Sequence, residues 1–210
     1  MTHLSREIRR GRKFDDVVAG ARDVFLREGF EGASVDAIAK AAGVSKATLY
    51  SYFPDKRLLF LEVARTECLR HAESAMVLAR TGQGVAATLK DVARRITGLY
   101  LSDFGLQVFR ICVAECDRFP ELGRTFYQSG PALARERLAA FLSAAVAKGE
   151  LVVQDCHLAA DQFVELCKAD LFARRVFNVR ERITDAEIER VIDGAVETFM
   201  ARYGRRTGPS

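Results

Sequence analysis

Several features that would indicate catalysis, export or membrane insertion are missing from this 210-residue sequence. It has no Gly-rich phosphate loop, GxSxG elbow, HExxH helix or calcium-binding loop, so the common catalytic and metal motifs are absent and we predict no enzyme. The longest apolar run, Leu138 to Val146, is interrupted by Ser143 and falls far short of the roughly 20 residues that a membrane span needs. No apolar segment follows the basic N-terminus, so we predict no signal peptide and expect a cytoplasmic protein.

The cysteines lack the spacing of a metal site. Cys68, Cys112, Cys116, Cys156 and Cys167 form no CxxC pair and no zinc-ligand pattern, and we predict neither metal nor cofactor. Cys112 and Cys116 stand four apart on one helical face, where Cβ atoms are about 5–6 Å apart. A disulfide needs about 3.5–4.5 Å. A thiol-responsive or soft-metal-responsive regulator using this pair remains an alternative, although buried cysteine usually behaves as a small apolar residue.

Helical periodicity runs along nearly the whole chain. The apolar fraction of 49% and the charged fraction of 29% are typical of a soluble globular protein. Only residues 151–153 read as a strand, and they are too short to build a sheet, so we predict an all-α protein. Pro120 and Pro131 each suit the first position of a helix. One helix is expected from Pro131 to Gly149, another over 158–177 and a last one over 185–203.

The stretch from Ser34 to Lys56 carries the pattern around which the chain is organised. Ser34 can cap a first short helix, and Gly43 can end it in the left-handed conformation. Ser45 can cap a second short helix, which Pro54 closes. Two short helices around a glycine turn predict a helix-turn-helix, whose second helix enters the DNA major groove.

The second of these helices has two unlike faces. Leu49 and Phe53 share one side, which we assign to the core. The opposite side carries small residues, Ala47, Thr48 and Ser51. Small side chains let a helix approach base edges, where a methyl group can touch the thymine methyl and a hydroxyl can hydrogen-bond. Tyr50 and Tyr52 flank this face, and we predict that their hydroxyl groups reach phosphates.

Two basic features accompany this helix. Lys56 falls in the first turn of a third helix, capped by Asp55, where the helix dipole disfavours a cation. Because the sequence shows no structural gain from this placement, we predict a phosphate contact. Residues 1–13 carry Arg6, Arg9, Arg10, Arg12 and Lys13 against a single Glu7. Beside a groove-reading helix, such an arm can contact phosphates or the minor groove.

Residues 14–60, and the order GVSKATLYSYF followed by PDK in particular, resemble the DNA-binding domain of the TetR family of bacterial regulators. The resemblance implies that Thr48, Tyr50, Tyr52 and Lys56 occupy positions that commonly touch DNA. It places Ser34, Ser45, Lys46 and Ala47 nearby. One departure is Tyr52, since many members carry His there. The predicted segments are a basic arm over 1–13, a helix-turn-helix domain over 14–57, a helical effector and dimerisation domain over 58–203 and a flexible tail over 204–210.

Aromatic side chains concentrate between residues 100 and 130. Within this region, the segment from Ala114 to Tyr127 resembles the effector domains of the AcrR/AefR-like branch. Ligand sites between bundle helices are mostly apolar, so we predict a small apolar or amphipathic effector. Its predicted contacts are His71, Tyr100, Phe104, Phe109, Cys112, Phe126 and Tyr127. The alternative is that these aromatic side chains are ordinary core residues.

The last helix carries a broad apolar stripe, and the helix before it has a similar one. In TetR-like proteins the last two long helices pair with their copies. The resemblance therefore implies a dimer interface at Phe163, Cys167, Leu171, Ile188, Val191, Ile192, Ala195 and Phe199. The alternative is an intramolecular core. Two helix-turn-helix domains related by a two-fold axis would suit a palindromic operator with half-sites about 34–36 Å apart.

Together these features predict a sequence-specific DNA-binding transcriptional regulator. The resemblance implies a repressor that a small effector releases from its operator. An all-α enzyme with a vestigial DNA-binding domain and a non-specific nucleic-acid scaffold are the alternatives from other classes.

Overall fold

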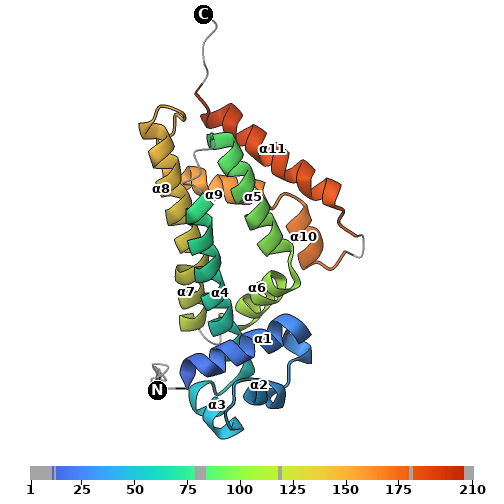
Figure 1. Cartoon of the computed structure of the whole chain (residues 1–210). Helices are drawn as coiled ribbons and strands as arrows, with labels where there is room; N and C mark the ends of the chain where they lie inside the picture. The colour runs from blue at the N-terminus through green and yellow to red at the C-terminus, as the bar shows by residue number, and fades with distance from the viewer. Residues whose placement is uncertain (1–10, 12, 79–83, 118–119, 180–181, 206–210) are drawn as a thin grey trace, which may run out of the picture. The chain divides into compact units, whose positions relative to one another are not determined.

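The computed structural model describes residues 11, 13–78, 84–117, 120–179 and 182–205 (Figure 1). Nearly all of them lie in helices, labelled α1 to α11, and in one π-helical turn, η1. The β contact found among these residues is an isolated antiparallel bridge between Leu151 and Gly204. The predicted all-α class is confirmed.

The chain divides into two compact units. The first unit comprises residues 1–67 and 107–126, and the second comprises residues 68–106 and 127–210. This division differs from the predicted boundary after residue 57, because the first part of α4 (Lys56–Leu78) and parts of α6 (Asp103–Glu115) and α7 (Pro120–Tyr127) belong with the helix-turn-helix.

The first unit is built on α1 (Phe14–Gly32), α2 (Val35–Ala41), α3 (Lys46–Tyr52) and the start of α4. Aromatic rings meet one another inside its core. The rings of Phe25 and Phe60 meet edge to face with centroids 4.9 Å apart, and those of Phe14 and Phe53 lie 5.3 Å apart. α1 and α2 approach closely at Gly20, which has no side chain to hold them apart.

The helical backbone of α1 is interrupted at Gly29, although α1 does not end there. Gly29 has φ 70° and ψ 178°, and helical backbone resumes through Gly32. Ala33 then donates its amide to the Gly29 carbonyl at 3.2 Å. The positive φ is the reason that glycine suits this position.

The second unit contains α5 (Val85–Leu101), α8 (Leu133–Ala147), α9 (Cys156–Leu166), α10 (Leu171–Val176) and α11 (Asp185–Tyr203). α11 packs along α5, and α8 packs against α9 (Figure 1). Thr184 caps α11 with Glu187 in a capping box. None of the described helices alone has the length and apolar composition of a membrane span. Two consecutive helices, Val85–Leu101 and Asp103–Ala114, reach that length and composition only when taken together, and the chain bends between them.

Two predicted helices are wrong in outline. Pro131 does not start a helix; it lies inside η1 (Gln128–Ala132), which joins α7 to α8 without a loop. The wider π turn accommodates a residue that has no amide to donate and whose ring crowds the preceding turn. The helix expected over 158–177 is two helices, because Asp170 adopts φ 60° between α9 and α10.

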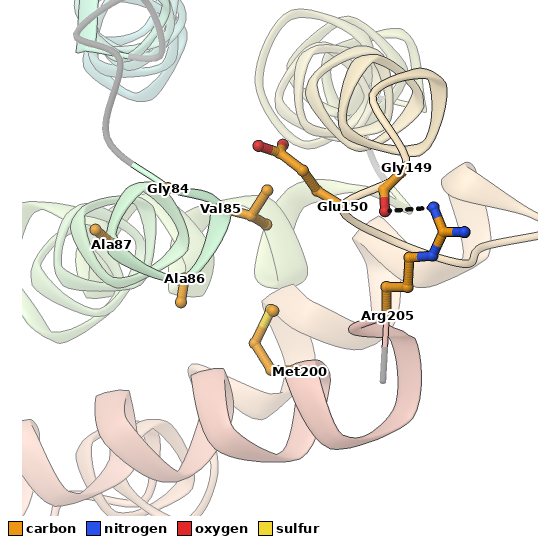
Figure 2. A pocket seen from close by; sticks show the side chains of 8 residues that line it. All are labelled: Gly84, Val85, Ala86, Ala87, Gly149, Glu150, Met200 and Arg205. Atoms are coloured by element: carbon orange, nitrogen blue, oxygen red, sulfur yellow. Dashed lines mark hydrogen bonds between the residues drawn. The ribbon is translucent and has the colours of Figure 1, made fainter. Parts of the chain in front are cut away.

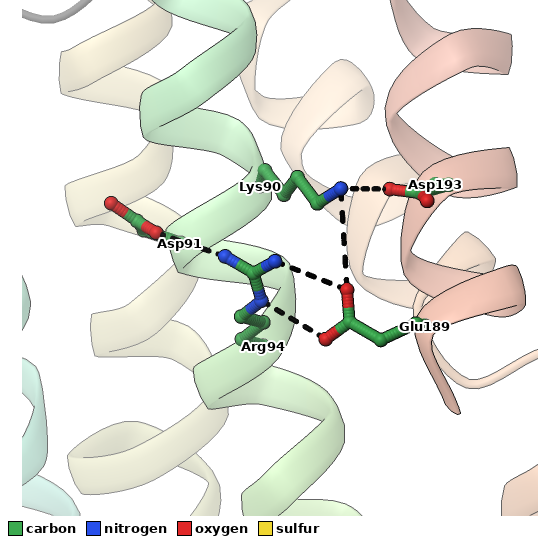
Figure 3. Close-up of polar contacts among 5 residues, drawn as sticks. All are labelled: Lys90, Asp91, Arg94, Glu189 and Asp193. Atoms are coloured by element: carbon green, nitrogen blue, oxygen red, sulfur yellow. Dashed lines mark hydrogen bonds and ion pairs between the residues drawn. The ribbon is translucent and has the colours of Figure 1, made fainter. Parts of the chain in front are cut away.

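Ion pairs tie α5 to α11 on the outside of the second unit (Figure 3). Arg94 donates from Nε and Nη2 to the two carboxylate oxygens of Glu189, both at 3.0 Å. Lys90 pairs with Asp193 and reaches Glu189, while Asp91 lies 3.5 Å from the Arg94 guanidinium. Such exposed pairs contribute little individually, and a network of them mainly fixes geometry.

The end of α11 is anchored. The Val152 amide donates to the Tyr203 carbonyl at 2.8 Å, and the Arg205 amide donates to Glu150 at 3.2 Å. The predicted flexible tail therefore does not begin at Gly204, and the strand-like residues 151–153 supply the bridge partner. Residues 206–210 lie outside the described part of the chain.

Candidate DNA-binding surface and effector region

Both helices of the predicted helix-turn-helix begin at the serine that the sequence indicated. Ser34 Oγ accepts the Ala37 amide at 3.0 Å, and Ser45 Oγ accepts the Thr48 amide at 3.1 Å. Each bond satisfies one of the amides that a helix N-terminus leaves without a partner. The starts of α2 and α3 are thus set by local side-chain chemistry.

The turn between these helices depends on Gly43. Its φ is 61°, and its amide donates to the Lys40 carbonyl at 3.2 Å. The Val44 amide donates to the Ala39 carbonyl at 3.0 Å, which completes a Schellman motif. A residue with a Cβ atom would be strained here.

The two faces of α3 are those predicted. Leu49 is 1% exposed and Phe53, just after the helix, is 0% exposed, so both hold α3 against the first unit. On the other side, Ala47 and Ser51 are exposed and Thr48 is half-buried. The core therefore fixes which face of α3 is free.

The hydroxyl groups on the free face of α3 are bonded within the chain. The Ser45 and Thr48 hydroxyl oxygens lie 2.9 Å apart, and Ser51 Oγ donates to the Thr48 carbonyl at 2.6 Å. Ser51 can therefore only accept a further hydrogen bond. The methyl groups of Ala47 and Thr48 form no hydrogen bonds and can make apolar contacts.

The two flanking tyrosines differ in environment. Tyr50 is 48% exposed. Tyr52 is half-buried, and its ring meets Phe14 edge to face at 5.9 Å. A Cβ atom added at Gly11 would lie 2.5 Å from the Tyr52 hydroxyl, so the described end of the basic arm passes beside this side chain. Residues 1–10 and 12 of the arm lie outside the part of the chain that the structure describes.

Lysines on α2 and α3 are exposed. Lys46 pairs with Asp36 at 2.6 Å, and this hydrogen bond raises the pKa of Lys46. Both side chains are exposed, so the pair is weak and exchangeable. Lys40, in the last turn of α2, is also exposed and forms no ion pair within the described residues. Nothing in the local sequence pattern distinguishes Lys40 from an ordinary surface lysine.

The start of α4 requires a correction. The Asp55 carboxylate accepts the Arg57 amide at 2.8 Å, which confirms the predicted cap. Lys56, however, has a structural partner that the sequence did not reveal: its Nζ donates to the Phe30 carbonyl at 2.9 Å and to the Ala33 carbonyl at 3.1 Å. The premise that its position brings no structural gain is wrong.

The predicted effector residues are divided between the two units. Phe109, Cys112 and Phe126 belong to the first, whereas Tyr100, Phe104 and Tyr127 belong to the second. Tyr127 is exposed and Phe104, Phe109 and Phe126 are half-buried. Tyr100 meets Phe172 edge to face at 5.2 Å, and Lys168 Nζ lies 4.9 Å from its ring centre. The side chain of His71 is not among those that the structure describes.

An open hollow of about 570 Å³ lies elsewhere in the second unit (Figure 2). It is formed by the start of α5, the end of α8 and the end of α11, and Arg205 Nη1 donates to the Gly149 carbonyl at its rim at 3.3 Å. Its lining is Gly84, Val85, Ala86, Ala87, Gly149, Glu150, Met200 and Arg205. None of the predicted effector residues lines it.

Most of the residues predicted at a dimer interface form the core of the second unit instead. Six are buried within a single chain: Phe163, Cys167, Leu171, Ile192, Ala195 and Phe199. Ile188 and Val191 are half-buried. These six side chains are covered by their own chain, as in the alternative of an intramolecular core, and a dimer interface along the two helices stays a prediction.

The thiols differ in exposure. Cys116 is exposed and its Sγ lies 3.3 Å from the Val113 carbonyl, while Cys112 is half-buried. Burial raises the pKa of the Cys167 thiol to about 12, so it stays protonated at neutral pH. Within the described residues no group of three or more His, Cys, Asp or Glu side chains could hold a metal ion.

Comparison with known proteins relates both parts of the chain to one family. Residues 17–63 match the family described as bacterial regulatory proteins of the tetR family, and residues 87–205 match the C-terminal domain of AefR-like transcriptional repressors. The repressor AcnR of Corynebacterium efficiens is 39% identical over 59 residues, and this match covers 28% of this chain and 31% of that protein. The chain thus spans about a third of the length of these curated relatives.

Two solved structures match over nearly the whole chain. A protein described as a TetR-family transcriptional regulator from Mesorhizobium loti MAFF303099 is 30% identical, with a TM-score of 0.79, and the match covers 95% of this chain and all of that one. The flavonoid-responsive regulator FrrA is 37% identical, with a TM-score of 0.65, over 94% of this chain and 100% of its own. On these matches and on the helix-turn-helix geometry, the chain belongs to the TetR family of DNA-binding transcriptional regulators and carries an AefR-like C-terminal domain.

Proposed function

We propose that this protein represses transcription by binding a palindromic operator as a homodimer, and that a small effector releases it. The observation that carries the DNA-binding part is the free face of α3, where Ala47, Thr48 and Ser51 stand opposite the buried Leu49. A helix that packed on protein would carry larger apolar residues there. A protein that binds operator DNA acts where the chromosome lies, which supports the cytoplasmic assignment.

Contacts to bases and contacts to phosphates fall on different residues in this proposal. Ala47 and Thr48 face the bases with methyl groups, and Ser51 can accept a hydrogen bond from a base. Tyr50, Tyr52, Lys46 and Lys40 supply phosphate contacts, with Ser34 and Ser45 nearby. Phosphate contacts set position and salt dependence, whereas base contacts set sequence preference.

The homodimer must use surfaces that one chain leaves free. On α11 the outward side carries Arg190, Gly194, Glu197 and Ala201, and on α9 Leu158 and Gln162 are exposed. Two-fold pairing through these faces would give the dimer one α3 from each copy, as a palindromic operator with two half-sites requires. The mass of the protein in solution, by light scattering, tests this: a monomer at micromolar concentration would contradict it.

The proposed effector is a small apolar or amphipathic molecule. FrrA is flavonoid-responsive by name and 37% identical, which makes flavonoids the first class to test. A ligand releases DNA only through its different affinity for the two conformations of the protein. Cys112 and Cys116 offer the alternative of a thiol response; replacing both with serine separates the two, because an effector response would survive the change.

The deciding experiment selects bound duplexes from a random pool with the full-length protein. A regulator should enrich a palindromic sequence and prefer it over random DNA by about 10³-fold or more at physiological salt. Equal affinity for all duplexes would favour the non-specific scaffold, and retention of no duplex would overturn DNA binding. Addition of a flavonoid panel to the selected complex then tests release.

A further inference from the structure

We propose that Lys56 is a positioning residue that clamps the end of α1 to the start of α4, and that it does not bind phosphate. The proposal rests on the DNA-binding function above. It reverses the role that the family resemblance implies for this lysine, and the geometry around its ammonium group is the reason.

The ammonium group is bound to main-chain oxygens. Lys56 Nζ donates to the Phe30 carbonyl at 2.9 Å and to the Ala33 carbonyl at 3.1 Å, so two of its three N–H groups have partners. Carbonyls at a helix C-terminus lack intrahelical donors, and the dipole there favours a cation. The break at Gly29 turns the last residues of α1 so that these two oxygens converge on one lysine.

An aromatic cluster holds the same group from the other side. Nζ lies 4.4 Å from the centre of the Phe30 ring. That ring meets Phe60 of α4 at 5.2 Å and Phe25 of α1 at 6.0 Å. A lysine swung out toward a phosphate would give up a cation–π contact as well as two hydrogen bonds.

The neighbouring cation is also engaged within the chain. The Arg57 guanidinium donates from Nε to both oxygens of Asp55, at 3.0 and 3.2 Å. The Arg57 charge is therefore taken up within the start of α4, and the Lys56 ammonium group is the one that reaches the end of α1. The phosphate contacts of this domain fall instead on Lys46 and Lys40, whose side chains are exposed.

A salt titration separates the two roles. Each phosphate contact contributes about 0.9 to the slope of log affinity against log salt, or about 1.8 for two copies. We would measure operator affinity between 50 and 300 mM salt, about the range in which such slopes are resolved, for the wild type, Lys56→Ala and Lys46→Ala. The temperature is one at which circular dichroism shows every variant fully folded.

For Lys56→Ala we expect weaker operator binding with an unchanged slope, while Lys46→Ala, the matched control, reduces the slope. A slope reduced by about 0.9 per site in Lys56→Ala would make Lys56 a phosphate ligand and overturn the proposal. If the folded Lys56→Ala variant binds the operator with wild-type affinity, Lys56 contributes to stability alone, and the positioning proposal is also overturned.

Thermal unfolding tests the clamp independently of DNA. Lys56→Ala and Phe30→Leu should each lower the midpoint by about 2–4 °C. The midpoint of the double variant should fall by less than the sum of the two single shifts, because both substitutions remove the same contact between Lys56 and the Phe30 ring. Additive shifts would overturn the clamp. If the wild type binds no duplex, the proposed function fails. The non-additivity of the two midpoint shifts then decides by itself whether Lys56 clamps α1 to α4.

Discussion

Arg22 of α1 and Glu67 of α4 stand 45 residues apart in the chain, and Arg22 Nε lies 2.6 Å from Glu67 Oε1. The Glu67 side chain is only 6% exposed, whereas that of Arg22 is 31% exposed. A carboxylate taken out of water is costly unless it is paired. The hydrogen bond from Glu67 also raises the pKa of Arg22. The pair fixes α4 to α1, the helix that supports α2 and α3.

Removing one partner of this pair should destabilise the first unit. We expect Arg22→Ala to lower the free energy of unfolding by about 1–3 kcal/mol, less than for a fully buried pair because Arg22 is partly solvated. Urea unfolding of the single and double variants with Glu67→Gln gives the coupling energy. Strictly additive effects would mean that the pair contributes nothing specific.

The approach of α1 to α2 at Gly20 predicts a second loss of stability. A Cβ atom at Gly20 would lie 2.5 Å from the Ala42 nitrogen, which is backbone and cannot move aside. We expect Gly20→Ala to cost about 1–3 kcal/mol and to weaken operator binding. Gly32→Ala is the matched control, because its Cβ would meet only Glu28 Cβ at 3.5 Å. Equal unfolding midpoints for the two variants would contradict the close contact.

The bonded hydroxyls of α3 predict that thymine methyl groups carry sequence preference. Replacing dT by dU one position at a time in the selected operator should weaken binding about fourfold where Thr48 touches a methyl, since one such group is worth about 0.8 kcal/mol. Thr48→Val keeps the methyl and should retain this sensitivity. Thr48→Ser keeps the hydroxyl but has no methyl group, so it should lose this sensitivity to dU. If the serine variant is weakened by dU at the same positions as the wild type, Thr48 does not contact a thymine methyl group.

The cap of α11 predicts a dependence of stability on pH. The hydrogen bond from Arg174 and those from Thr184 lower the pKa of Glu187 to about 2, from an ordinary 4.5. Its stabilising effect is therefore complete above about pH 4.5 and is lost as the pH falls toward 2. The unfolding midpoint of Glu187→Gln should lie below that of the wild type at pH 6, and the gap should narrow by pH 3. Glu197→Gln, an exposed carboxylate on the same helix, should show no such gap.

Local signals in the sequence predicted local structure well. Ser34, Ser45 and Asp55 cap helices because a short polar side chain reaches an amide two or three residues ahead, and this depends on no distant residue. The opposite faces of α3 followed from helical spacing alone. Pro131 misled, because a proline that suits a helix start is also tolerated inside a π turn.

The sequence by itself determined the all-α class, the caps of α2, α3 and α4, the glycine turn and the face of α3 that is free. These depend on backbone geometry and on periodicity within about four residues. Only the tertiary structure decided that Lys56 bonds to Phe30 and Ala33, that Glu67 meets Arg22 and that the stripe around Ile192 is core. Those contacts join residues far apart in the chain, and a periodic pattern states that a face is buried without stating which surface covers it.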